Sequence, residues 1–396
     1  MNLKRVLLLL AGLASAFTAF TAHADLAALL TKGATATATP PPRRPSIIFI
    51  QCHGLARGDL SCYGQTNFQT PNLDRLAADG IRFAHYTGGV DSAATTAQLL
   101  AGNSFPPTNG ESNLAQQLQQ NGYHTGLIGE WSLAGQPWTQ GFDEFAGFMT
   151  DAEAQNYYAE TLWRYAPNSI FDPTNSRLNA YIGKEEIYPN SGGKKGAYLP
   201  ELLINAANNF IRINAPDAAS HYRPFFLLVN FPAPRTATTG VDNFPVPSDA
   251  PFTEEKWPQA AKNRAALITR LDTGIGRVFE QLTKLGMTNN VAVFFTASSA
   301  PEKFANTNLN FLLPAADFRA AKKPTPQPMI VIWPGTIPAS RVSQAPWSAI
   351  DFAPSALGIA YVKPTDNFTG ISMLPVLTGE QKEAAPDSTW PLPQGQ

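Results

Sequence analysis

The 396-residue sequence contains only two cysteines, Cys52 and Cys62. This scarcity excludes a disulfide-scaffolded domain and any iron–sulfur or cysteine-rich metal site. Charged residues make up 15% of the chain, and 29 basic against 30 acidic residues give a net charge of −1. The chain therefore lacks a net basic field that would attract nucleic acid or an anionic lipid surface. A hydrophobic content of 44% excludes a disordered chain, so we expect a globular protein with one large domain or two ordinary ones.

Residues 1–24 are predicted to be a secretory signal peptide. Lys4 and Arg5 form a basic start, residues 6–20 are apolar, and Ala-His-Ala at 22–24 is a small-residue cleavage site. The apolar stretch is shorter than the ~20 residues that span a bilayer, although an uncleaved anchor is the alternative. We therefore expect a periplasmic or secreted protein with no membrane span after cleavage.

The ends of the remaining chain differ in composition from its middle. Residues 25–45 form an Ala/Thr/Pro-rich segment without apolar periodicity, which predicts a tether. Residues 380–396 are a second aperiodic, Pro-rich segment, predicted to be a tail. The folded domain is therefore expected at 46–379.

Within that domain, short apolar runs alternate with amphipathic helical stretches. Strands that are apolar on both faces and separated by helices predict an α/β fold with a mostly parallel central sheet and helices on both faces. Ligands bind such sheets at the carboxyl ends of the strands. The predicted strands are 46–50, 125–129, 225–231, 291–295 and 329–333, and the predicted helices are 71–77, 114–121, 199–213 and 260–285.

Ten segments share their order and approximate spacing with a known family. They include RPSIIFI, TPNLDRLAADGIRFAHY, LAQQLQQNGYHTGLIGEW, PFFLLVNFPAP and SAIDFAPSALGIA. Over nearly all of residues 45–379 the chain resembles the sulfatase family of the alkaline phosphatase superfamily. The resemblance implies an alkaline phosphatase/sulfatase-like α/β sandwich, with the family's C-terminal subdomain abbreviated.

The resemblance also implies a chemistry. Sulfatases hold calcium with oxygen ligands at the strand ends, and their nucleophile is a formylglycine made from Cys or Ser in a C/S-x-P-x-R motif. Lysine, histidine and arginine side chains neutralise the sulfate and protonate the leaving group. Each of these positions can be compared with this sequence.

Four positions correspond to the calcium ligands of the family. His53 and Gly54 stand in place of the paired aspartates after the first strand, and Ser298 and Ser299 replace the later Asp-Asn. None of the four carries a carboxylate, so calcium would lose its charge neutralisation and most of its ligands. We therefore predict no metal cofactor.

The nucleophile and sulfate-binding positions differ as well. Ser92 stands at the nucleophile, with Thr96 at the motif's arginine and an alanine at its proline. Glu130 replaces the family lysine, Ser132 a histidine and Arg235 another histidine, and the last lysine cannot be placed within 303–323. Glu130 puts a negative charge where sulfate needs a positive one. Arg235 either pairs with Glu130 across the pocket mouth or both side chains are solvated.

Two hypotheses follow. The favoured one is an exported, catalytically degenerate sulfatase-like protein that binds an unknown ligand, or a protein or glycan partner. The alternative is an active sulfuric- or phosphoric-ester hydrolase with Ser92 as nucleophile and a non-standard metal site, because DSAAT at 91–95 resembles the serine segment of alkaline phosphatases. Few metal ligands remain for it, since the histidines after the signal are His53, His85, His124 and His221. A displaced Asp91 or Asp317 that completed an oxygen cage would favour this alternative.

Several other residues leave alternatives open. Cys52 and Cys62 either form a bridge or remain thiols, and His53 is either a hydrogen-bonded structural residue or part of the pocket chemistry. Five aspartates are predicted to cap helices and fasten loops: Asp59, Asp74, Asp143, Asp272 and Asp351. One aromatic set is predicted to be core packing, with a sugar-binding cleft as the alternative: Trp131, Trp138, Phe142, Phe145 and Phe148.

Overall fold

The structure is a computed structural model that describes residues 43–89, 91–104, 111–166, 181–220, 223–237, 244–301, 312 and 326–381. All described helices and strands lie in one compact unit, Arg44–Gln396. The predicted signal peptide, most of the tether and tail, His221 and Asp317 lie outside the described residues. No helix in the described ranges is long and apolar enough to cross a membrane.

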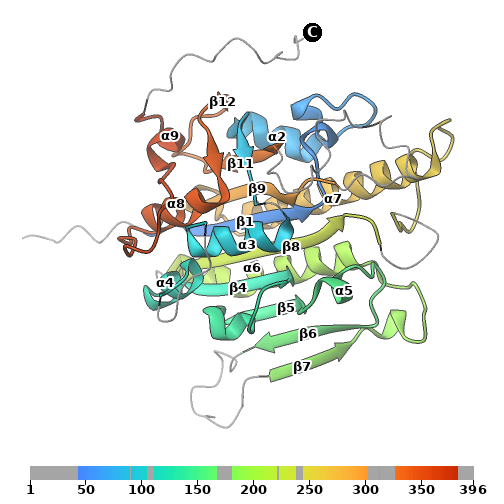
Figure 1. Ribbon diagram of the computed structural model, residues 1–396, viewed down its shortest axis with the longest axis horizontal. Coiled ribbons are helices and arrows are strands. Elements are labelled where there is room, and N and C mark those ends of the chain that lie inside the picture. Colours follow the sequence, from blue (N-terminus) through green and yellow to red (C-terminus); the bar gives the residue numbers. More distant parts are fainter. Residues whose placement is uncertain are drawn as a thin grey trace, which may run out of the picture. The chain divides into compact units, whose positions relative to one another are not determined.

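A mixed ten-stranded sheet forms the centre of this unit, in the order β12-β2-β11-β9-β1-β8-β4-β5-β6-β7 (Figure 1). Its middle strands, from β9 to β5, are parallel to one another. This arrangement confirms the predicted α/β class and the mostly parallel sheet. The strands are β1 (Ser46–His53), β2 (Ile81–Phe83), β4 (His124–Glu130), β5 (Glu144–Phe148), β6 (Thr161–Ala166), β7 (Tyr181–Glu186), β8 (Phe225–Pro234), β9 (Val291–Ser299), β11 (Met329–Ile332) and β12 (Arg341–Ser343).

Both outer parts of the sheet depart from the parallel pattern. β11 pairs antiparallel with β9 and β2, and β6 and β7 extend the other side as antiparallel strands. The sequence pattern placed the strand at 329–333 but not its direction, and it missed β6 and β7. A separate small sheet has the order β10-β3-β13. Its strands are β10 (Pro326–Gln327), β3 (Tyr86–Thr87) and β13 (Trp347–Ser348).

Helices cover the two faces of the central sheet because alternate side chains of each buried strand point to opposite sides. Ile48 and Ile50 of β1 pack in one core, while Ile47 and Phe49 pack in the other. The first core receives α2 (Pro71–Asp79), α6 (Leu199–Ser220) and α7 (Gln259–Lys284). The second receives α3 (Ser92–Ala101), α4 (Leu114–Gln120), α8 (Phe352–Ile359) and α9 (Leu374–Thr378), and the short helix α5 (Asp151–Ala154) follows β5.

The five aspartates fasten these elements together as predicted. Asp272 on α7 accepts hydrogen bonds from the Leu73 amide (2.8 Å) and the Asn72 side chain (2.8 Å), which joins α7 to the start of α2. Asp351 accepts from the backbone amides of Ser348 and Ile371, both at 2.8 Å. The remaining three accept backbone amides in the same way: Asp59, Asp74 and Asp143.

The structure settles the alternatives for the two cysteines and for the aromatic set. Cys52 and Cys62 are free thiols, and Cys52 is buried. Burial raises the pKa of both thiols, which keeps them protonated. The aromatic set is core packing, as predicted, because four of its members are buried in the two cores and Trp138 packs on Tyr165 at 5.0 Å.

Candidate functional site

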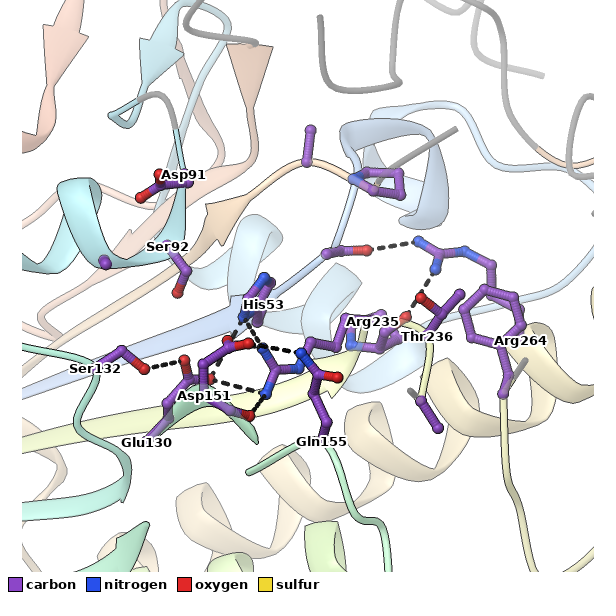
Figure 2. Close-up of a pocket in the computed structure, with 17 residues that line it drawn as sticks. His53, Asp91, Ser92, Glu130, Ser132, Asp151, Gln155, Arg235, Thr236 and Arg264 are labelled. Carbon is purple, nitrogen blue, oxygen red and sulfur yellow. Dashed lines mark hydrogen bonds and ion pairs between the residues drawn. The ribbon is translucent and has the colours of Figure 1, made fainter. Parts of the chain in front are cut away.

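The carboxyl ends of the parallel strands meet the start of α3 around one cavity of about 490 Å³ (Figure 2). Strand register produces this meeting, because His53 at the end of β1 lies beside Pro234 of β8 and Ser299 of β9. Six of the predicted site residues line the cavity: His53, Gly54, Ser92, Glu130, Ser132 and Arg235. The structure therefore brings these six residues together in one cleft.

The other three predicted residues lie buried below the cavity. Ser298 accepts a hydrogen bond from the Ser92 hydroxyl at 2.7 Å. Ser299 accepts from the Gly54 amide at 3.2 Å, and Thr96 accepts from Gln51 at 2.9 Å. Their hydroxyls therefore support the backbone and side chains of the cavity wall.

The backbone conformation and surroundings at position 54 require glycine. It has a φ of +82°, and the Arg235 Cα lies 3.0 Å from the position that a Cβ would occupy. A side chain here would be strained and would collide with the strand-end segment that carries Arg235. The close approach of the two segments therefore depends on glycine.

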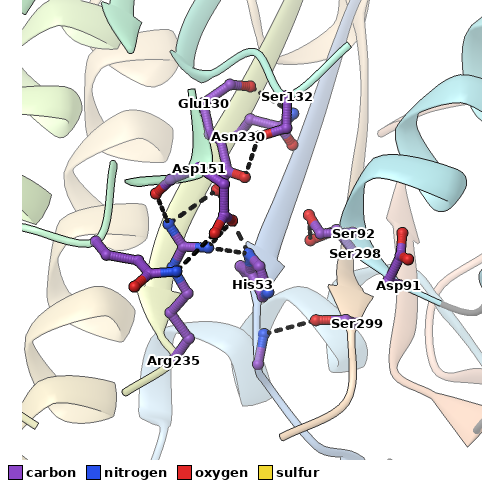
Figure 3. A network of polar contacts seen from close by, with 12 residues as sticks. His53, Asp91, Ser92, Glu130, Ser132, Asp151, Asn230, Arg235, Ser298 and Ser299 are labelled. Atoms are coloured by element: carbon purple, nitrogen blue, oxygen red, sulfur yellow. Dashed lines mark hydrogen bonds and ion pairs between the residues drawn. The ribbon is translucent and has the colours of Figure 1, made fainter. Parts of the chain in front are cut away.

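A network of charged side chains is centred on the Arg235 guanidinium (Figure 3). Its Nη1 lies 3.0 Å from His53 Nδ1 and donates to the Asp151 carboxylate. Its Nη2 donates to the Asp151 carbonyl oxygen at 3.0 Å and lies 3.6 Å from Glu130 Oε2. The guanidinium is only 8% exposed. The predicted pair of Arg235 and Glu130 is thus present, within a larger cluster.

Asp151 and Gln155 belong to this cluster and were not predicted. Gln155 Nε2 donates to Asp151 Oδ2 at 2.6 Å, and both residues line the cavity. Asp151 begins α5, just after β5. The rule that site residues follow buried strands would have indicated Asp151, but β5 is not among the strands predicted from the sequence.

His53 can make only one of two competing contacts through Nδ1. Arg235 Nη1 must donate at 3.0 Å, because guanidinium has no acceptor, whereas Glu130 Oε2 lies farther away at 3.4 Å. Nδ1 therefore acts as the acceptor, and the ring proton lies on Nε2. In the described part of the chain Nε2 has no partner, so it is a donor for the cavity.

Glu130 is ionised in this environment. Burial on its own would raise the pKa of its carboxyl, but the neighbouring Arg235 guanidinium and the Ser132 hydroxyl outweigh burial and hold the pKa below its usual range. Ser132 Oγ donates to Glu130 Oε1 at 2.5 Å. The carboxylate is therefore a fixed negative charge in the cavity wall at neutral pH.

The lowered pKa of Glu130 predicts an acid-sensitive contribution to stability. This contribution is complete above the ordinary pKa of 4.5 and is lost as pH falls below that value. Between pH 5 and pH 3 we expect wild type to lose roughly 1–2 kcal/mol more stability than Glu130→Gln. Urea unfolding at pH 5 and pH 3 measures the effect, with Glu280→Gln, an exposed α7 carboxylate, as the control. Equal losses for wild type and Glu130→Gln between these pH values would contradict the prediction.

Ser92 is the first residue of α3 and is buried. Its hydroxyl donates to Ser298, and the described residues offer it no contact with a histidine or carboxylate base. Asp91 caps the helix by accepting from the Ala94 amide at 2.8 Å. One Asp91 oxygen is thus engaged by the backbone and does not complete an oxygen cage with the strand-end residues.

One group of described residues has ligand atoms close enough to hold a metal ion. His53, Glu130 and Asp151 offer atoms that lie within 4.8 Å of one another. The Arg235 guanidinium contacts all three. This cluster therefore already has a cation, supplied by the chain itself.

Comparison with known proteins gives a consistent result. A profile of the sulfatase family matches residues 45–362. The N-acetylgalactosamine-6-sulfatase of Canis lupus familiaris is 26% identical over 386 residues, which cover 86% of this chain and 67% of that protein. The N-acetylglucosamine-6-O-sulfatase of Bacteroides thetaiotaomicron is 24% identical over 418 residues, covering 87% of this chain and 72% of the relative.

The fold agrees with solved structures. One from a study of glycosaminoglycan metabolism by Bacteroides thetaiotaomicron has a TM-score of 0.65 at 20% identity, covering 87% of this chain and 83% of the other. That likeness concerns the fold alone, whereas the family profile covers most of the chain. The chain belongs to the sulfatase family.

Proposed function

We propose that this chain is a sulfatase-family protein that does not hydrolyse sulfate esters and instead binds a ligand in the strand-end cavity. The observation that carries the proposal is the Arg235 cluster. Its guanidinium is held by His53, Asp151 and Glu130, so its positive charge is already compensated inside the protein. Little of that charge is left to stabilise an incoming sulfate.

The residues that stand at the family's sulfate-binding positions, by the sequence resemblance, support the proposal. Glu130 corresponds to a lysine that binds sulfate in the family, and the lowered pKa keeps it ionised. A sulfate beside it would meet a buried negative charge, which is strongly unfavourable in a site of low dielectric constant. Ser132 donates to Glu130 and so is not free to protonate a leaving group.

The residues present do not fit the calcium that the family implies. Calcium prefers several carboxylate and carbonyl oxygens. The corresponding positions are His53, Gly54, Ser298 and Ser299, and the Ser298 hydroxyl is engaged by Ser92. The nearby carboxylates contact Arg235 instead.

The proposal includes a location and a domain division. Export to the periplasm or the medium rests on the predicted signal peptide at 1–24, with the tether at 25–45, the sulfatase-like domain at 46–379 and the tail at 380–396. The cavity ligand would then be an extracytoplasmic molecule. The relatives named above are an N-acetylgalactosamine-6-sulfatase and an N-acetylglucosamine-6-O-sulfatase, which favours a carbohydrate as the ligand.

A hydrolysis assay tests the proposal. Wild type and Ser92→Ala are incubated with 4-nitrophenyl sulfate, 4-nitrophenyl phosphate and hexosamine 6-sulfates, with and without calcium or zinc. We expect no turnover above the protein-free control with either protein, because no base contacts the Ser92 hydroxyl. Turnover that disappears in Ser92→Ala would overturn the proposal and establish the hydrolase alternative.

A further inference from the structure

We infer that a groove between α2 and α7 binds the chain's own C-terminal segment, residues 389–396. This inference concerns a second cavity and does not depend on the proposed function. Four features carry it: the apolar lining of the groove, the paired charges at its rim, the composition of the segment, and the place where the described chain ends.

The groove has a volume of about 780 Å³ and lies at the edge of the sheet opposite the strand-end cavity. Val291, the first residue of β9, lines the groove, whereas Ser299 at the end of β9 lies below the strand-end cavity. At about 3.3 Å per residue, the strand separates these two residues by roughly 26 Å. The groove is therefore a separate site.

The lining of the groove is largely apolar. Its apolar side chains come from α2, α7, β9, β11 and the segment after β11, and they include Leu76, Phe279, Leu282, Val293, Ile332 and Pro334. Phe279 and Pro334 are half-buried and Ala339 is exposed, so an occupant can reach apolar surface from outside. Covering this surface is favourable because it removes apolar atoms from water.

The charged side chains at the rim of the groove are paired with one another. Arg75 Nε lies 3.5 Å from Asp79 Oδ2, and Lys284 Nζ lies 3.8 Å from Glu280 Oε2. These four side chains are the charged residues among those that line the groove. The rim therefore has no excess of either sign and favours an uncharged, apolar occupant.

The segment TWPLPQGQ at residues 389–396 has this character. It contains no charged residue, and it places Trp390 and Leu392 before two prolines. Proline-rich segments favour an extended conformation, so they lose little entropy when they bind to grooves that contain aromatic side chains. Phe279 supplies such a side chain, and tryptophan is a frequent anchor of binding.

The described chain ends beside the wall of the groove. Arg341 Nη1 donates to two carbonyls at the end of α9, at 2.9 and 3.0 Å (Figure 1). The preceding residue, Ser340, donates to the Ala78 carbonyl of α2 through its amide at 2.8 Å, and Ala339 lines the groove. The segment that forms this wall therefore also holds the end of α9.

The C-terminal segment lies within reach of the groove. Trp390 is nine residues beyond Gln381, where the described chain ends, and nine residues extend to at most about 30 Å. A segment tethered so close has an effective concentration in the millimolar range. A second copy of the chain would reach that concentration only in a very concentrated solution. The chain's own segment is therefore the favoured occupant.

Disulfide trapping in the full-length protein tests this inference. Ser388→Cys places a thiol two residues before Trp390, and Thr283→Cys places one in the groove. Thr273→Cys is the matched control, because Thr273 lies on α7 outside this groove. Both threonines are exposed, and each donates at 2.9 Å to a carbonyl four residues earlier. We expect Ser388→Cys to form an intramolecular disulfide at least roughly 10-fold faster with Thr283→Cys than with Thr273→Cys.

Two further variants assign the trapping to the tryptophan. Trp390→Asp, added to the pair of Ser388→Cys and Thr283→Cys, should abolish the faster trapping because it puts a charge against apolar surface. Ala384→Asp adds the same charge six residues before the anchor and should leave the trapping unchanged. Hydrogen exchange without added cysteines gives a second measurement: amides at 335–339 should exchange faster in Trp390→Asp than in wild type or Ala384→Asp.

Equal rates of trapping for Thr283→Cys and Thr273→Cys would overturn the inference, and so would trapping that persists in Trp390→Asp. Disulfides that join two chains would show that a second copy supplies the segment, which also contradicts the intramolecular contact. Unchanged exchange at 335–339 in Trp390→Asp would show that Trp390 does not cover the groove. All of these outcomes leave the proposed lack of hydrolysis standing, since that proposal concerns the other cavity.

Discussion

Arg235→Ala is expected to bind zinc more tightly than the wild type does. His53, Glu130 and Asp151 already place one nitrogen and two oxygen ligands within 4.8 Å of one another. Histidine with carboxylates and a water completes a tetrahedral zinc coordination. In the wild type the guanidinium contacts all three residues, and zinc would have to displace it. We expect Arg235→Ala to bind one zinc ion at least roughly 100-fold more tightly than wild type.

Calorimetric titration with zinc chloride and elemental analysis measure this effect. Arg235→Lys keeps a cation in the cluster and should remain free of zinc, which separates the loss of charge from the loss of the arginine shape. Arg235→Ala combined with His53→Ala removes a ligand and should abolish the new site. Stoichiometric zinc in the wild type would show that the guanidinium does not occupy the cation position. A folded Arg235→Ala that binds no zinc would show that the three residues cannot reorganise into a site.

The parallel centre of the fold was predictable because its strands are buried on both faces. β1, β8 and β9 appear in the sequence as continuous apolar runs, and the amphipathic stripe of α7 is equally plain. Once these strands are parallel and adjacent, their ends must meet. This geometry explains why residues as distant in sequence as His53 and Arg235 lie in one cleft.

The outer strands were harder to predict because their patterns are weaker. β6 is only half-buried and carries Trp163, Arg164 and Tyr165 in succession, without a continuous apolar run. The direction of β11 depends on its pairing with β9 and β2, which no local pattern encodes. Missing β5 and α5 hid Asp151, and with it one carboxylate partner of Arg235 in the charge network. Local sequence patterns identified the strands whose ends form the wall of the site. The contacts that set the charge of the site join segments distant in sequence, so no local pattern encodes them.

The pair of Asp59 and Arg264 is expected to have a large effect on stability. Both side chains are fully buried, and their atoms approach to 2.5 Å. Arg264 also donates to the carbonyls of Gly54 and Pro234, so it joins α7 to the ends of β1 and β8 beside the cavity. Asp59→Asn leaves this guanidinium buried without a counter-charge. We expect a loss of about 3–5 kcal/mol in the free energy of unfolding.

Urea unfolding of three variants tests this expectation against matched alternatives. Asp79→Asn breaks the pair of Arg75 and Asp79, whose side chains are 83% and 56% exposed, and should change stability by less than about 0.5 kcal/mol. Asp59→Asn combined with Arg264→Met removes both charges and should recover part of the loss, because the main penalty is the uncompensated guanidinium. If the double variant is no more stable than Asp59→Asn, the hydrogen bonds of Arg264 to Gly54 and Pro234 carry the stability instead. In that case the segment that positions His53 and Arg235 is held mainly by the hydrogen bonds from Arg264 to the backbone. The charge of Asp59 then serves only to neutralise the Arg264 guanidinium.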